Sequence, residues 1–114
     1  MNKYVAIYIT APNEEEGEAI ARALVEESLC ACASIIPSVR SIYRWEGNIC
    51  DEREVLLIAK TLSLMAPIVI DRVKALHSYK VPEIVCVPIV TGSGEYLDWV
   101  SDSVDSPASE GADF

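Results

Sequence analysis

The fold is decided by residues 32–60, CASIIPSVRSIYRWEGNICDEREVLLIAK, which predict a long β-hairpin. Residues 32–46 are rich in β-branched and aromatic types, and residues 49–60 return with the same character. Gly47-Asn48 between them is a two-residue hairpin signal. Two paired strands of about a dozen residues extend about 40 Å, at about 3.3 Å per residue. A compact domain of this size has a radius of gyration of about 13 Å, so we expect the hairpin tip to project beyond the core.

The flanking sequence predicts two more strands and three helices. Residues 3–11 are β-branched and aromatic and form a strand. Residues 84–90 are continuously apolar and predict a strand buried on both faces, with Pro88 at an edge or bulge. Asn13, with Glu16 three residues later, is a helix N-cap signature. Apolar residues at spacings of three and four place helices over residues 14–29, from Thr61 or Ser63 through His77, and over residues 95–104.

The order of elements is β-α-β-β-α-β with a terminal helix. It predicts an α+β domain with the ferredoxin-like split βαβ arrangement, in which helices cover one face of an antiparallel sheet. The other face of the sheet, which no helix covers, is called the bare face. The chain is 51% hydrophobic with a mean hydropathy of +0.24, so we expect the bare face to pack against other subunits. The predicted domain spans residues 1–104. Residues 105–114 are small and acidic and are predicted to be disordered.

Composition excludes several functions and indicates a compartment. The formal net charge is −9, and the nine basic residues are scattered, so we expect no nucleic-acid partner and no anionic membrane surface. No signal peptide or membrane-spanning run is visible. The cysteines are too few for a disulfide scaffold, which predicts a reduced, cytoplasmic protein. We expect burial for Cys30, Cys32 and Cys86 and exposure for Cys50.

The stretch from Leu76 to Ile84 holds the only histidine, His77. Neutral imidazole suits a metal ligand or an acid–base group, while a structural role at the helix C-terminus is the alternative. One histidine cannot form a metal site alone, so a second subunit would have to add ligands. Tyr79 follows in the same stretch. Glu83 either ligates a hard cation or is solvated or salt-bridged.

Further candidates lie on the hairpin. Glu54 and Lys60 are six residues apart on one strand and therefore share a face. They either bind a small zwitterion or anion in an intersubunit cleft or form an ion pair across the subunits. Tyr43 and Trp45 either stack on a ligand or pack on a neighbouring subunit. No nucleophile elbow, P-loop or HExxH motif is present, which predicts a protein that is not an enzyme.

Several short motifs occur in a specific order along the chain: Thr10-Ala11-Pro12, Leu29 to Ala33, Ser41-x-Tyr43-x-Trp45-x-Gly47, Glu54, Lys60-Thr61, His77-x-Tyr79-x-x-Pro82-Glu83-Ile84 and Tyr96-Leu97-x-Trp99. Taken together, these motifs resemble the CutA-type divalent-cation tolerance proteins over residues 4–100. The resemblance implies a homotrimer related in architecture to PII signalling proteins, and an association with tolerance to copper and other divalent cations.

The chain departs from that family's pattern at four positions. Ser78 and Lys80 stand where proline and glutamate are common in the family. Ile9 and Leu76 stand where some members have a cysteine and a histidine that have been proposed as copper ligands. Of that set, His77 alone is present.

The leading hypothesis is a cytoplasmic, non-enzymatic homotrimer in divalent metal tolerance, acting by weak metal binding or sensing. It needs no obligatory cofactor, and Cu(II) or another divalent cation is the candidate ligand. The alternative is a PII-like signalling trimer that holds a small molecule in clefts between subunits, lined by Glu54, Lys60, His77 and Tyr79. A less favoured alternative is an enzyme that uses His77 in the same cleft. Trimer formation also predicts high thermal stability.

Overall fold

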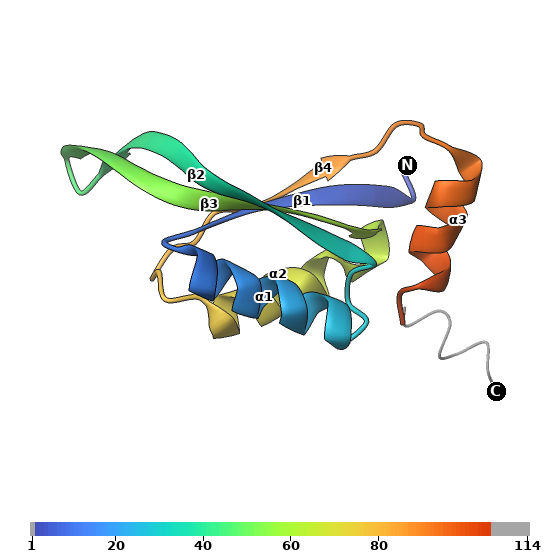
Figure 1. Cartoon of the computed structure of the whole chain (residues 1–114). Helices are drawn as coiled ribbons and strands as arrows, with labels where there is room; N and C mark the ends of the chain where they lie inside the picture. Colours follow the sequence, from blue (N-terminus) through green and yellow to red (C-terminus); the bar gives the residue numbers. More distant parts are fainter. Residues whose placement is uncertain (1, 106–114) are drawn as a thin grey trace.

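A four-stranded antiparallel sheet forms the body of the chain, in the order β2-β3-β1-β4 (Figure 1). The computed structural model describes residues 2–105, and the predicted disordered tail lies almost wholly outside this range. The strands are β1 (Tyr4–Ala11), β2 (Cys32–Trp45), β3 (Asn48–Leu62) and β4 (Ile84–Pro88). The helices are α1 (Glu14–Glu26), α2 (Ala66–Leu76) and α3 (Gly94–Asp102), with a 3-10 turn at Ser63–Met65. The predicted ferredoxin-like order is confirmed.

Helices α1 and α2 cover one face of the sheet (Figure 1). The core lies between them and the sheet, and its members include the fully buried Ile7 and Ile9 of β1, Leu57 of β3, Leu24 of α1 and Val73 of α2. Gly17 lets α1 approach closely, because a Cβ there would lie 2.8 Å from the Val55 side chain. Helix α3 lies beyond one end of the sheet (Figure 1), where its Val100 enters the same core.

The opposite face of the sheet has no helix over it. Tyr8 pairs with both Ile58 and Val85, so the three side chains form one row across this face. Val85 is 50% exposed and Val87 is 41% exposed. The prediction that residues 84–90 are buried on both faces is therefore wrong for the single chain. The strand lies at an edge of the sheet and ends at Pro88.

The hairpin projects as expected, but its turn differs from the prediction. Trp45 pairs with Asn48, so the turn residues are Glu46 and Gly47 rather than Gly47-Asn48. Both have positive φ, 49° and 82°, as a type I′ turn requires. Farther from the tip, the β2–β3 ladder shifts register between Ile36 and Val39. Pro37 lies at this shift and has no N–H to donate to the ladder. The chain measures 51 × 27 × 24 Å with a radius of gyration of 15.0 Å, larger than the ~13 Å of a compact domain.

Two predicted helix boundaries are wrong for identifiable reasons. α2 begins at Ala66 rather than at Thr61 or Ser63, because β3 continues to Leu62. Thr61 does not cap a helix; its buried hydroxyl donates to the Leu29 carbonyl at 2.7 Å. α1 ends at Glu26 rather than at 29, and the chain reverses through Ser28, whose φ is 60°.

The described part of the chain contains no helix that is long and apolar enough to cross a bilayer.

Candidate functional site

His77 directly follows α2, and its side chain is completely buried, with a relative exposure of 0%. The backbone N–H of Tyr79 donates to His77 Nδ1 at 3.0 Å. Nδ1 must therefore be unprotonated, and in the neutral ring Nε2 carries the proton. That N–H donates to the Thr10 carbonyl oxygen at 2.7 Å, across to the end of β1. His77 thus joins α2, β1 and the loop that leads to β4.

Both imidazole nitrogens are occupied, so the ring offers no lone pair to a metal in this conformation. This geometry favours the structural alternative for His77. Ligation through Nδ1 would require the Tyr79 N–H to leave that nitrogen, and it stays a prediction. Among residues 2–105, no group of three or more histidine, cysteine, aspartate and glutamate side chains could hold a metal ion.

Glu16 anchors the same loop from α1. Its Oε2 accepts from both the backbone N–H and the hydroxyl of Ser78, each at 2.9 Å, and lies 3.3 Å from His77 Nδ1. The predicted N-cap at Asn13 is present, and its side-chain oxygen accepts from the Glu16 N–H at 2.8 Å. The carboxylate serves the loop instead. Proline has no backbone N–H, so a proline at position 78 could not make the backbone hydrogen bond to Glu16.

Tyr79 and Glu54 form the centre of the candidate site. The Tyr79 hydroxyl donates to Glu54 Oε2 at 2.8 Å, and Glu54 is only 6% exposed. Burial and the adjacent Glu54 carboxylate raise the pKa of Tyr79 well above its ordinary value of 10.0. Glu54 forms no salt bridge with any residue in the described range.

Tyr79 and Glu54 line a pocket of about 390 Å³ between the hairpin and the 78–83 loop. A second hollow of about 450 Å³ adjoins it and shares four of its residues. We call the two together the hairpin groove. Its principal side chains are Tyr43, Trp45, Glu54, Tyr79, Val81 and Glu83.

The groove unites most, but not all, of the residues predicted to form a site. Glu54, Tyr79 and Glu83 line one pocket with Tyr43 and Trp45. The remaining two predicted residues lie elsewhere.

His77 lies behind the groove, with its ring centroid 4.8 Å from that of Tyr79. Lys60 pairs with Ala6 and Cys32 in the sheet. It stands six residues from Glu54, about 20 Å along an extended strand. The predicted cleft that contains both Glu54 and Lys60 is therefore not formed within one chain.

Three further residues contribute to the candidate site and are not predicted by the sequence analysis. Glu52 accepts from the Tyr43 hydroxyl at 3.0 Å, and this bond raises the Tyr43 pKa to about 12. Its alternation with Glu54 on one strand face could have indicated it. Thr10 acts through its backbone carbonyl, and Val81 through its place in the loop, and neither contribution has a signal in the sequence.

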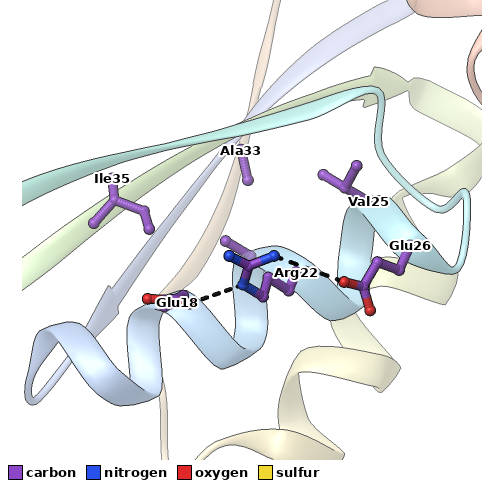
Figure 2. Close-up of a pocket in the computed structure, with 7 residues that line it drawn as sticks. Glu18, Arg22, Val25, Glu26, Ala33 and Ile35 are labelled. Atoms are coloured by element: carbon purple, nitrogen blue, oxygen red, sulfur yellow. Dashed lines mark hydrogen bonds and ion pairs between the residues drawn. The ribbon is translucent and has the colours of Figure 1, made fainter.

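A separate pocket of about 420 Å³ lies between α1 and β2, and no motif in the sequence indicates it. Its apolar floor includes Ala33 and Ile35 (Figure 2). Arg22 lies at its edge, 2.8 Å from Glu18 and 3.9 Å from Glu26. Dashed lines in Figure 2 mark both ion pairs. This arginine is therefore already paired within α1.

The four cysteines are free thiols. Cys30 is buried, and burial raises its pKa to about 12. Cys32 Sγ lies 3.5 Å from the Tyr96 hydroxyl. Cys86 is half-buried and packs against the core, while Cys50 is half-buried rather than exposed.

The comparisons with known proteins agree on one family. The CutA1 divalent ion tolerance protein family matches residues 5–103. The divalent-cation tolerance protein CutA of Thermus thermophilus is 50% identical over 97 residues, which cover 85% of this chain and 94% of that protein.

The solved structure of the Thermus thermophilus protein, described as a divalent cation tolerance protein (Cut A1), superposes with a TM-score of 0.87 at 48% identity. It covers 90% of this chain and 99% of the other. CutA1 of Oryza sativa superposes with a TM-score of 0.88 at 38% identity, over 91% and 95% of the two chains. On this agreement over nearly its whole described length, the chain belongs to the CutA1 family of divalent ion tolerance proteins.

Proposed function

We propose that this protein is a homotrimer that takes part in tolerance to divalent cations, that it is not an enzyme, and that it acts in the cytoplasm. Family membership carries the metal-tolerance role, because the similar proteins are named for it. The free thiols of all four cysteines fit a reducing compartment. The non-enzymatic role is supported by His77, the one histidine of the sequence, which lies behind the groove with both ring nitrogens hydrogen-bonded to backbone groups.

The proposal that copies of this chain associate is supported by the bare face of the sheet. Tyr8, Ile58, Val85 and Val87 present a contiguous apolar surface there, which a monomer would leave in water. The two edge strands, β2 and β4, also carry unpaired backbone groups that another copy could use. The number of subunits comes from the resemblance to PII-like trimers. Tyr43 and Trp45 are 36% and 43% exposed. The exposed part of each ring, which does not face the groove, is proposed to contact a neighbouring subunit.

Metal binding would have to be weak or shared between copies. A divalent cation needs several oxygen, nitrogen or sulfur donors at once, and one chain offers no such group among residues 2–105. The carboxylates of Glu52, Glu54 and Glu83 around the groove are the hard donors that a second copy could complete.

Sedimentation equilibrium tests the assembly. We expect a mass three times that of the 12.5 kDa chain. Val85→Asp places a charge on the bare face and should shift the protein to monomers. Val90→Asp is the matched control, because Val90 is 86% exposed and lies outside the strands. A monomeric wild type would refute the trimer, and equal behaviour of the two variants would refute the bare face as the interface.

Growth in copper tests the function. A bacterial strain that lacks its own CutA and is sensitive to copper should regain tolerance when it expresses this chain. The Val85→Asp variant should fail to restore tolerance while accumulating to the same level. Failure of the wild-type chain to restore growth, at normal expression and trimer content, would overturn the metal-tolerance role.

A second function is favoured by the hairpin groove itself. Its pocket of about 390 Å³ lies within the size range of small-molecule sites, about 300–1,000 Å³. The PII-like alternative, in which a small ligand binds beside the hairpin and is completed by a neighbouring subunit, therefore stands as a second candidate.

A further inference from the structure

The hairpin groove contains a buried carboxylate without a basic partner. Glu54 is 6% exposed, and its one side-chain hydrogen bond in the described chain comes from the neutral hydroxyl of Tyr79. Burying a carboxylate is costly unless a counter-charge accompanies it. Neither lysine nor arginine lines the pocket that holds Glu54, and Lys80 lines only the adjoining hollow. The charge that would balance Glu54 is therefore missing from the pocket.

A second carboxylate and two aromatic rings border the same pocket. Glu83 lies on the loop side, and Tyr43 and Trp45 lie on the hairpin side. The Tyr43 ring is held in place by the bond from its hydroxyl to Glu52 at 3.0 Å. Aromatic faces attract cations, and they do so best when the cation sheds little water on binding. The pocket thus combines negative charge with faces that favour a weakly hydrated cation.

We propose that the hairpin groove binds a small organic ammonium ion, held by Glu54 and Glu83 and enclosed by the rings of Tyr43 and Trp45. The inference gives a ligand class to the second candidate function and rests on it. Within a single chain a divalent metal ion fits less well, because it requires several oxygen ligands together and gains nothing from aromatic walls. An anion or a zwitterion fits less well because the pocket has no basic lining residue.

Choline provides the probe, and its neutral isostere 3,3-dimethylbutan-1-ol provides the test of charge. The variant Trp99→Phe leaves Trp45 as the single tryptophan, so fluorescence reports the groove alone. Titration with choline chloride, at constant ionic strength and in EDTA, should give saturable quenching in the range of about 0.1–10 mM. The neutral alcohol should bind at least about tenfold more weakly, since it lacks the charge that Glu54 attracts.

Charge variants locate the binding. In the same background, Glu54→Gln keeps the side-chain volume and an acceptor for Tyr79, and it should weaken choline binding by about tenfold or more. Glu95→Gln on α3 makes the same change in net charge and should leave binding unchanged. Glu83→Gln, at an exposed position, should cost about threefold. If circular dichroism shows that the Glu54→Gln variant is unfolded, the choline affinity of the Glu83→Gln variant still tests the role of charge in the groove.

Three results would overturn the proposal. One is the absence of saturation below about 100 mM choline; another is equal binding of the neutral alcohol. The third is choline binding by a monomeric Val85→Asp variant but not by the assembled protein, which would show that a second copy fills the groove. Because the titration contains EDTA and is independent of copper tolerance, its failure is distinct from failure of the metal role.

Discussion

Replacing His77 by alanine should destabilise the protein even when no metal is present. The side chain is fully buried and joins two backbone groups, the Thr10 carbonyl at 2.7 Å and the Tyr79 N–H at 3.0 Å. Each lost hydrogen bond costs about 1 kcal/mol, so the two together cost about 2 kcal/mol. The vacated ring volume adds about 1–2 kcal/mol. The free energy of unfolding should therefore fall by about 3–4 kcal/mol.

Chemical denaturation in EDTA measures this change, at a fixed chain concentration because association contributes to stability. Leu76→Ala is the matched control. Leu76 is the preceding residue, is 36% exposed, and should lose about 1 kcal/mol or less. A metal ligand without a structural role would leave stability in EDTA almost unchanged. A loss below about 0.5 kcal/mol for His77→Ala would refute the hydrogen-bonded role derived from the structure.

Three further predictions concern the turn, an ion pair and the thiols. Glu46→Asn should stabilise the hairpin by about 0.5–1 kcal/mol in thermal unfolding, since Glu46 has φ 49° and Asn tolerates that conformation better; no gain would contradict the I′ geometry. Arg72 hydrogen-bonds Glu27 and lowers its pKa below the ordinary 4.5, so the pair stabilises the fold above that pH and loses its effect as the pH falls. The stability difference between wild type and Arg72→Gln should shrink on acidification, and a difference constant with pH would contradict it. Iodoacetamide should modify Cys50 first and Cys30 only after denaturation, because Cys30 is buried with a pKa of about 12; mass spectrometry of peptides reads the order, and early labelling of Cys30 would contradict its burial.

Most of the fold was predictable because periodicity is local. Residues 3–11 alternate outward and inward in the structure, with Val5, Ile7 and Ile9 buried, as a half-buried strand should. The projecting hairpin followed from strand length alone. The observed turn, Glu46-Gly47, lies one residue before the predicted turn, Gly47-Asn48. Gly47-Asn48 is the commoner local turn signal, but the register of the whole β2–β3 ladder places Glu46-Gly47 at the tip.

The candidate site was predictable only in part. The sequence singled out Glu54 by its six-residue strand spacing from Lys60, and Tyr79 and Glu83 by their place in the stretch around the only histidine. Their partnership was not visible, since Tyr79 and Glu54 are 25 residues apart and meet only when the 78–83 loop passes beside the hairpin. Glu54 and Lys60 share a strand face, but their six-residue separation in the sequence already implies about 20 Å along the strand, too far for one single-chain site.

The sequence by itself determined the order of elements, the long hairpin and the apolar surplus, because all three follow from residue types and local spacing. The tertiary structure decided what His77 does. A histidine at the end of a helix can be a ligand or a structural group, and assigning the hydrogen bonds of its two nitrogens distinguishes these roles. Their partners, Thr10 and Tyr79, are backbone groups, and backbone groups have no signature in a sequence. The fold brings those groups to the ring, and their hydrogen bonds occupy the electrons that a metal would need.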